Sequence, residues 1–282
     1  MSFAEMTEKY FRPGRLPHIW CPGCGHGITT GAIIKAIDGL GLEKDNVAVV
    51  SGIGCSSRAS GYLDFNTVHS AHGRALPVAT GVKLANPELN VIVCTGDGDC
   101  TAIGGNHLIH AARRNINVTV VLFNNNIYGM TGGQYSPMTP TGSKASTAPY
   151  RTIEQPFNIT DLVQAAGATF VARSTTFHVA QLVDMIKKGI QHDGFSFIEV
   201  VSACPTSFGR ANKCGSPGDM MKWQRDHAVM KLAWDKMDAE KQAAAKAAGK
   251  FPIGVLYENN TIKEYTKAYD EVIAIAQGGD KK

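Results

Sequence analysis

Two polar turns of the sequence carry the residue types that bind a divalent cation. Gly96 to Asp99 follows the mostly β-branched run Asn90 to Thr95. Asn124 to Asn126 follows a similar run, Asn117 to Phe123. Both runs are typical of buried parallel strands, and Ala102 to Arg114 between them is typical of a helix. A right-handed crossover puts both turns at one edge of the sheet, where open α/β sheets bind ligands.

The ligands that these turns offer are oxygens, which suit Mg²⁺. Asp97 provides a carboxylate, Asn125 a side-chain carbonyl and Ile127 a backbone carbonyl. Mg²⁺ prefers octahedral oxygen and usually completes its shell with phosphates and water. Gly96 and Gly98 lack the β-carbons that would hold a diphosphate away, and the following helix N-terminus favours its charge. The alternative interpretation is that both are ordinary turns with capping residues and no metal. The presence of the second, Asn-rich turn argues against this alternative.

Four of the seven cysteines could form a second metal centre. Cys21 and Cys24 form a Cys-x-x-Cys pair, and Cys55 and Cys204 each follow an expected strand, on the edge that carries Asp97. Convergent thiolates suit an Fe–S cluster or a structural Zn²⁺. Structural zinc sites usually use two closely spaced pairs, so the single cysteines favour a [4Fe–4S] cluster. Zinc and reduced structural thiols stay as alternatives.

Strands and helices must position these groups. Their pattern along the sequence predicts one α/β unit with a mostly parallel sheet and helices on both faces. Besides the two central strands, we expect strands at Asn46–Ser51, Thr169–Arg173 and Phe195–Ser202, and an edge strand at Phe251–Tyr257. The expected helices are Ile28–Leu40, Pro77–Asn86, Asn158–Gly167, Phe177–Gln191 and much of Met220–Lys250.

Residues 1–282 are expected to form a single domain with an N-terminal arm, 1–20, and a C-terminal extension, about 210–282. Prolines and a glycine make Tyr10–Trp20 irregular, and the polar C-terminus should be frayed. Gln134–Phe157 is rich in Pro, Thr, Ser and Gly and has no periodicity. Loops of that length are usually lids or binding loops.

Composition excludes several classes of protein. The chain is 44% hydrophobic, and its net charge of +4 is weak and spread out. No basic stripe with interleaved aromatics supports nucleic-acid binding, and no apolar run approaches the ~20 residues of a membrane span. Met1 to Trp20 lacks the apolar core of a secretory signal. We therefore expect a cytoplasmic protein whose cysteines are reduced or bound to metal.

The two turns resemble a known cofactor motif. Gly96 to Gly98, a helix, a strand and then Asn124-Asn125 look like the thiamine diphosphate motif. Tyr128 to Gln134 resembles its continuation in 2-oxoacid:ferredoxin oxidoreductases, although family members often carry a Lys where this chain has Gly132. The resemblance implies the thiamine diphosphate-binding α/β fold.

The cysteines fit the same resemblance. Trp20 to Gly25, Gly52 to Ser56 and a late Cys-Pro look like the β-subunit pattern of that family, in which four cysteines hold one [4Fe–4S] cluster. Cys214 rivals Cys204 as the fourth ligand, but it lies in a Gly/Ser/Lys loop with no strand to fix it, so we prefer Cys204.

The resemblance also implies the residues that hold the cofactor. Asp97, Asn125 and Ile127 would bind Mg²⁺. The residues expected to contact thiamine diphosphate are Gly54, Gly96, Asp97, Gly98, Asp99, Asn125 and Thr131.

Three further residues are candidates for catalysis. Arg58 could bind a substrate carboxylate through two hydrogen bonds, and relatives have a basic residue associated with the 2-oxoacid there; a solvated surface Arg is the alternative. His72 could hydrogen-bond the substrate or the diphosphate, with a structural histidine as the equal alternative. Met130 is expected to contact the substrate side chain because of its place in the motif.

The function implied is that of a β subunit of a 2-oxoacid:ferredoxin oxidoreductase. His18 to Gly27 and Gly129 to Pro140 look most like 2-oxoglutarate-type subunits, so we expect oxidative decarboxylation of 2-oxoglutarate with coenzyme A to succinyl-CoA and CO2, with electrons passing through the cluster to ferredoxin. Pyruvate is the alternative substrate. A non-redox thiamine diphosphate decarboxylase or synthase subunit and a zinc-bound assembly subunit are the alternatives from other classes.

A partner chain is implied as well. In the family, the Glu that activates the cofactor comes from the α subunit, and no acidic residue here stands in an equivalent context. We therefore expect activity only in a complex with an α subunit, as a dimer of α–β heterodimers.

Overall fold

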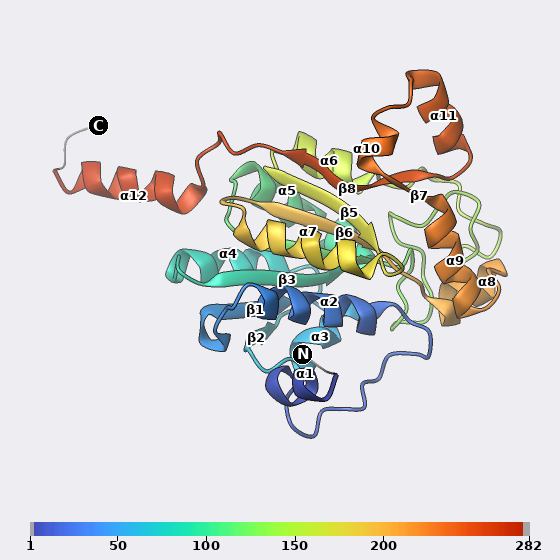
Figure 1. The fold of residues 1–282 in the computed structure, drawn as a ribbon, viewed down its shortest axis with the longest axis horizontal. Helices are drawn as coiled ribbons and strands as arrows, with labels where there is room; N and C mark the ends of the chain where they lie inside the picture. Colours follow the sequence, from blue (N-terminus) through green and yellow to red (C-terminus); the bar gives the residue numbers. More distant parts are fainter. Residues whose placement is uncertain (1–2, 279–282) are drawn as a thin grey trace.

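The computed structural model describes residues 3–278 and contains one eight-stranded sheet with the order β2-β1-β3-β4-β6-β5-β8-β7 (Figure 1). The strands are β1 (Val47–Ser51), β2 (Asn66–His69), β3 (Asn90–Gly96), β4 (Thr119–Asn124), β5 (Phe170–Thr175), β6 (Ser196–Val201), β7 (Ala228–Met230) and β8 (Phe251–Glu258). All neighbours are parallel except β5 and β8. The predicted α/β class is confirmed.

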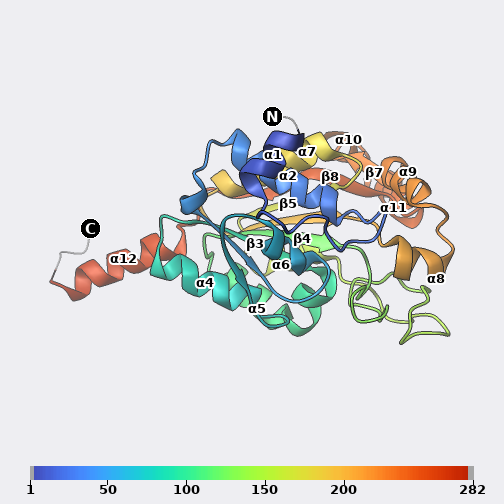
Figure 2. The same cartoon turned by 90° about the horizontal axis from the view of Figure 1, so that it is seen from below.

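Helices cover both faces of the sheet (Figure 2). Helices α2 (His26–Gly39) and α7 (Val179–Gln191) pack together on one face, and α4 (Ala75–Ala85), α5 (Gly105–Arg113) and α6 (Ile159–Ala165) cover the other. The remaining helices are α1 (Phe3–Tyr10), α3 (Ala59–Tyr62), α8 (Arg210–Asn212), α9 (Pro217–His227), α10 (Lys231–Trp234), α11 (Ala239–Ala247) and α12 (Tyr265–Ala276).

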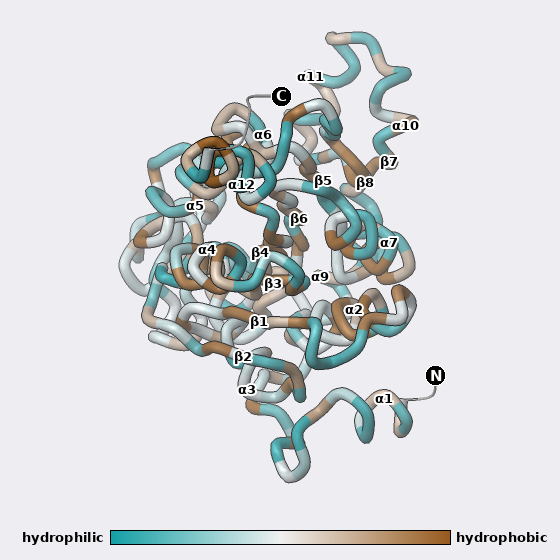
Figure 3. Tube along the Cα trace, turned by 90° about the vertical axis from the view of Figure 1, so that its left-hand side faces the viewer, coloured by the Kyte–Doolittle hydropathy of each residue, from teal (hydrophilic) through white to brown (hydrophobic). Residues whose placement is uncertain are grey.

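Each face of the sheet has its own hydrophobic core because successive side chains of a strand point to opposite faces. In β1, Val47 and Val49 belong to the core under α2 and α7, whereas Ala48 and Val50 belong to the core under α4 and α5. Figure 3 shows hydrophobic residues along β1 and β3 and on α2 and α7. Burial on both faces explains why these strands are continuous apolar runs.

Several expected elements differ at the edges of the sheet. Strand β2 was not predicted, because its residues are polar and mostly exposed. Phe251–Tyr257 was predicted as an edge strand, but β8 lies between β5 and β7. Strand β7 interrupts the predicted helical segment Met220–Lys250, since its three residues pair with β8. Such tertiary pairing leaves no local sequence pattern.

The two ends of the chain are more regular than predicted. The expected arm begins with the helix α1, and the irregular part starts after Tyr10. Residues 265–276 form α12, which projects from the body of the protein (Figure 1). The Glu264 carboxylate caps this helix by accepting the backbone N–H groups of Thr266 and Lys267. The C-terminus was expected to be frayed, and its last residues, 279–282, lie outside the described range.

The segment between β4 and α6 has no helix or strand, as predicted, and is fixed by turns and side-chain hydrogen bonds. Within residues 3–278, none of the helices is long and apolar enough to span a bilayer.

Candidate active site

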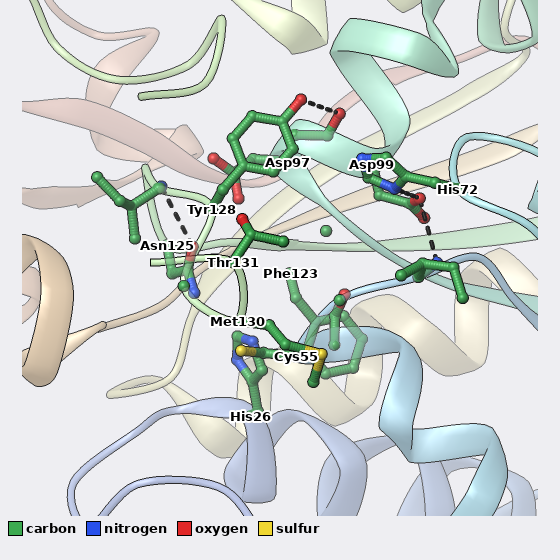
Figure 4. Close-up of a pocket in the computed structure, with 17 residues that line it drawn as sticks. His26, Cys55, His72, Asp97, Asp99, Phe123, Asn125, Tyr128, Met130 and Thr131 are labelled. Carbon is green, nitrogen blue, oxygen red and sulfur yellow. Dashed lines mark hydrogen bonds and ion pairs between the residues drawn. The ribbon is translucent and has the colours of Figure 1, made fainter. Parts of the chain in front are cut away.

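The carboxyl ends of β3 and β4 lie side by side, because the strands are parallel neighbours in which Gly96 pairs with Phe123. A pocket opens at this edge of the sheet (Figure 4). Its lining contains every residue expected to contact Mg²⁺ or thiamine diphosphate, and also Cys55, His72 and Met130. The two polar turns therefore meet where the sequence predicted.

Asp97 is a buried carboxylate that lacks a cationic partner among the described residues. It accepts hydrogen bonds from the Ser136 hydroxyl and from the backbone N–H groups of Gly98 and Asn125. Burial nevertheless raises the pKa of Asp97 to about 7. A divalent cation would offset this desolvation and favour the ionised form. With the oxygens of Asn125 and Ile127 in the same pocket, the donor set fits Mg²⁺.

The long loop reaches both turns through two hydroxyl side chains. The Ser136 hydroxyl donates to Asp97, and the Ser136 backbone N–H donates to Thr139 Oγ1 at 2.8 Å. Thr139 Oγ1 donates in turn to the carbonyl of Asn126 at 2.6 Å. The loop therefore holds the acidic turn and the Asn-rich turn in one fixed arrangement.

Asp99 uses both carboxylate oxygens to hold neighbouring segments. Oδ1 accepts the backbone N–H groups of Ile53 at 3.2 Å and Gly73 at 2.7 Å, and it lies 2.5 Å from Nδ1 of His72. Oδ2 accepts the hydroxyl of Thr95 at 2.8 Å. Asp99 and His72 line the predicted cofactor pocket, but their side chains are hydrogen-bonded to each other (Figure 4).

The two glycines of the acidic turn are closely covered by side chains. A β-carbon on Gly98 would lie 2.3 Å from the ring of Tyr128, whose hydroxyl donates to the Gly98 carbonyl at 2.9 Å. On Gly96, a β-carbon would lie 2.9 Å from the hydroxyl of Ser56. Gly98 therefore requires glycine because the ring of Tyr128 fills the space beside it, whereas a β-carbon on Gly96 would require the Ser56 hydroxyl to move.

A buried ion pair between Glu199 and Arg173 supports the Asn-rich turn through a hydrogen bond to Asn124. Glu199 of β6 accepts from the Asn124 amide at 2.8 Å and from Arg173 Nε at 2.6 Å. The side-chain oxygen of Asn124 accepts the backbone N–H of Asn126 at 3.2 Å. Asn126 has a positive φ of 62°, which Asn tolerates better than most residues. The pair therefore fixes the turn that carries Asn125.

Arg173→Met is expected to lower the free energy of unfolding by about 3 kcal/mol, because it leaves the charge of Glu199 buried without its partner. Urea unfolding measures this change. Arg225→Met is the matched control, since Arg225 pairs with Asp226 on the surface and should lose less than about 1 kcal/mol. Equal losses in the two variants would contradict a buried, coupled pair.

The thiols of Cys21, Cys24, Cys55 and Cys204 are close enough to influence one another. Burial, with a smaller contribution from the neighbouring cysteines, raises the pKa of Cys24 to about 12 and that of Cys55 to about 11. A β-carbon on Gly129 would lie 3.3 Å from the sulfur of Cys55 and 3.8 Å from that of Cys204. Thiols gathered in this way fit a bound cluster, which would keep them as thiolates.

The other cysteines are separate from this group. Burial also raises the pKa of Cys214, without a contribution from another cysteine. Cys94 and Cys100 are buried in the two cores, on opposite faces of the sheet. Across residues 3–278, no three His, Cys, Asp or Glu side chains are grouped so as to hold a single metal ion.

Of the three residues expected to take part in catalysis, Arg58 is the one that does not line the pocket. Its side chain is partly buried, and its Nε is enclosed without a hydrogen-bond partner. Met130 lines the pocket and is 45% exposed, so it is accessible to a ligand. Thr131 also lines the pocket, and its hydroxyl donates to Gln134 at 2.6 Å.

Several site residues were missed from the sequence. Glu199 had a signal, since it is the only charged residue in its fully buried strand. His26 follows the Cys-x-x-Cys loop directly and lines the pocket, where burial lowers its pKa to about 4. Ser136 and Tyr128 lie in stretches that the resemblance covers, but only the folded loop shows that they reach Asp97 and Gly98.

Comparison with known proteins shows the family of the chain. Residues 52–200 match the model of the thiamine pyrophosphate enzyme, C-terminal TPP binding domain. The chain is 54% identical over 243 residues to the 2-oxoglutarate synthase subunit KorB of Methanothermobacter marburgensis, covering 86% of this chain and 85% of that protein. It is also 38% identical over 260 residues to subunit beta of 2-oxoacid:ferredoxin oxidoreductase 2 of Aeropyrum pernix, covering 90% and 84%. The chain belongs to the 2-oxoacid:ferredoxin oxidoreductase family.

A solved structure of this family has the same fold. The 2-oxoglutarate:ferredoxin oxidoreductase of Magnetococcus marinus, described with 2-oxoglutarate, coenzyme A and succinyl-CoA bound, superposes with a TM-score of 0.84. The sequence identity is 35%, and the match covers 97% of this chain and 91% of that one. The predictions of a β subunit of this family and of a thiamine diphosphate-binding fold are confirmed.

Proposed function

We propose that this chain binds thiamine diphosphate, Mg²⁺ and a [4Fe–4S] cluster as the β subunit of a 2-oxoglutarate:ferredoxin oxidoreductase. The observation that carries the proposal is the meeting of an oxygen-donor set and four thiols at one edge of the sheet. When bound, thiamine diphosphate supplies carbanion stabilisation at the 2-oxoacid, and a cluster accepts electrons. The residues of this chain supply binding, orientation and electrostatics.

The metal would be held by Asp97, Asn125 and the carbonyl of Ile127. The helix-proximal turn around Gly96 and Gly98 would face the diphosphate, because backbone N–H groups there favour negative charge. Asp99 has a supporting role in this proposal, since its oxygens already hold the segments at positions 53 and 73.

The proposal requires a partner chain. Among the described residues that line the pocket, Asp97 and Asp99 are the acidic ones, and no Glu is present. The glutamate that activates the cofactor would therefore come from an α subunit. The expected dimer of α–β heterodimers and the cytoplasmic location stay predictions.

The substrate proposal is 2-oxoglutarate, with coenzyme A as acyl acceptor and ferredoxin as electron acceptor. Support comes from the names of the relatives and from the ligands of the Magnetococcus marinus enzyme. A second carboxylate needs a cationic or multi-donor partner, since an unpaired buried charge costs several kcal/mol. The described pocket lining has no Lys or Arg, so Arg58 or the α chain would supply it.

One experiment separates the proposal from its alternatives. The chain is produced anaerobically with its α subunit and analysed by visible absorption, iron, sulfide and thiamine content. We expect a brown protein that retains both thiamine diphosphate and an iron–sulfur cluster. Thiamine diphosphate without iron would indicate a non-redox decarboxylase or synthase subunit, and zinc without thiamine diphosphate would indicate an assembly subunit.

Arg58→Met tests the substrate-binding role of this arginine. We expect kcat/KM for 2-oxoglutarate to fall by an amount equal to about 1.5–3 kcal/mol, the scale of a lost charge-assisted hydrogen bond. Steady-state kinetics of the α–β complex measure it. Arg113→Met is the control, because Arg113 ends α5, whose C-terminus lies at the opposite edge of the sheet. Unchanged kinetics of Arg58→Met with every 2-oxoacid would exclude the role.

A further inference from the structure

Buried polar atoms without partners gather next to the four cysteines. Among residues 3–278, the buried side-chain atoms that lack a hydrogen bond belong to His26, Ser57, Arg58, His110, Ser196 and Ser202. Four of these six residues lie two or three positions from a cysteine of the group: His26 follows Cys24, Ser57 and Arg58 follow Cys55, and Ser202 precedes Cys204. Their shared nearness to the cysteines in the sequence points to an acceptor that lies among the cysteines.

Ser202 has the best defined position of these residues. Its backbone N–H donates to the carbonyl of Asn124 at 2.8 Å, just after the end of β6. A β-carbon built on Gly25 would lie 2.5 Å from the Ser202 hydroxyl oxygen. Gly25 directly follows Cys24, so the hydroxyl lies beside the backbone next to one cysteine and is two positions from Cys204 in the sequence. The side chain is also nine-tenths buried, since only 7% of the residue is exposed.

A buried hydroxyl without a partner is costly. Leaving such a donor unsatisfied destabilises the folded state, and nearly all buried polar groups of folded proteins therefore have a partner. The described part of the chain offers Ser202 no acceptor. The sulfurs of a cluster held by Cys24 and Cys204 would be hydrogen-bond acceptors next to it.

We propose that the Ser202 hydroxyl donates a hydrogen bond to a sulfur of the [4Fe–4S] cluster and thereby raises the reduction potential of the cluster. The inference rests on the proposed function, because it requires that the four cysteines hold this cluster. One-electron reduction adds a negative charge to the cluster, and a hydrogen bond to its sulfur stabilises the more negative state more strongly. Ser202 would therefore act on the driving force for electron transfer to the cluster, through the reduction potential of the cluster.

Strand β6 offers a matched control. Ser196 begins the same strand, is fully buried and also has a hydroxyl without a partner. The cysteine group lies at the opposite, carboxyl end of β6. Ser196→Ala therefore removes the same chemical group from the same strand without removing a donor to the cluster.

The experiment is an anaerobic redox titration of the α–β holoenzyme, followed by the electron paramagnetic resonance signal of the reduced cluster. We expect Ser202→Ala to lower the equilibrium constant for one-electron reduction at least tenfold, which is a shift of about 59 mV to lower potential. Ser196→Ala and Ser202→Thr, which keeps the hydroxyl, should titrate at the wild-type potential.

Two results would overturn the inference. One is a wild-type potential in Ser202→Ala protein that carries full iron. The other is an equal downward shift in Ser202→Ala and Ser202→Thr, which would mean that packing and not the hydroxyl sets the potential. Iron and sulfide analysis of the wild-type complex separates these from a failure of the proposed function, since a wild-type complex without a cluster refutes that function directly.

Discussion

Asp97→Asn abolishes the retention of Mg²⁺ and thiamine diphosphate while the chain stays folded. This is the expected result because Asp97 is the charged ligand of the proposed metal site, and the neutral amide of Asn would leave the buried cation without a charged partner. The amide can still accept the hydrogen bond from Ser136. Bound thiamine diphosphate, measured after gel filtration in Mg²⁺, reports the loss.

The apo chain gives an independent readout of the same residue. Burial raises the pKa of Asp97 from 3.8 to about 7. Because the folded chain then holds a proton that the unfolded chain releases, stability should fall as pH rises from about 4 to about 7. Asp97→Asn should lack this contribution and should be the more stable apo protein at neutral pH.

Two controls make the test specific. Ser136→Ala removes the hydroxyl that contacts Asp97 but keeps the carboxylate, so it should weaken cofactor retention without abolishing it. Asp226→Asn changes a surface carboxylate and should have no effect. A normal thiamine diphosphate content in Asp97→Asn would refute the metal assignment.

Cys204→Ser is expected to remove the cluster, and Cys214→Ser is expected to leave it intact. Cys21→Ser, Cys24→Ser and Cys55→Ser should each reduce iron content as sharply as Cys204→Ser, since a serine oxygen is a poor substitute for a thiolate ligand. The physical reason for the contrast is position: Cys204 lies beside Cys55 across Gly129, whereas Cys214 is not among the cysteines that influence Cys24 or Cys55.

Iron, sulfide and visible absorption of anaerobically purified complexes measure this contrast, and Cys214→Ser is its internal control. A bleached Cys214→Ser protein together with a brown Cys204→Ser protein would show that the fourth ligand is Cys214.

The centre of the fold could be predicted from the sequence because its signals are local. The β-branched runs that became β3 and β4 are buried on both faces, and the crossover rule then fixes where their polar turns meet. The same reasoning put Cys55 and Cys204 at the edge that carries Asp97, and the structure has them there.

The missed features depend on contacts between distant segments. Strand β7 exists because it pairs with β8, and Ser136 reaches Asp97 only after a loop without periodicity has folded. Arg58 shows the same limit, since the sequence put it on the turn after Cys55 but gave no sign that the described pocket lining would leave it out. The spacing of residues in the sequence determines which turn carries a side chain. The packing of the folded chain determines where that side chain points.

The most direct test of the account is the rate of ferredoxin reduction by the α–β complex with coenzyme A and either 2-oxoglutarate or pyruvate. We predict reduction with 2-oxoglutarate and a far lower kcat/KM with pyruvate. A higher kcat/KM with pyruvate would contradict the proposed substrate, and an iron-loaded complex that reduces ferredoxin with neither 2-oxoacid would contradict the proposed function itself.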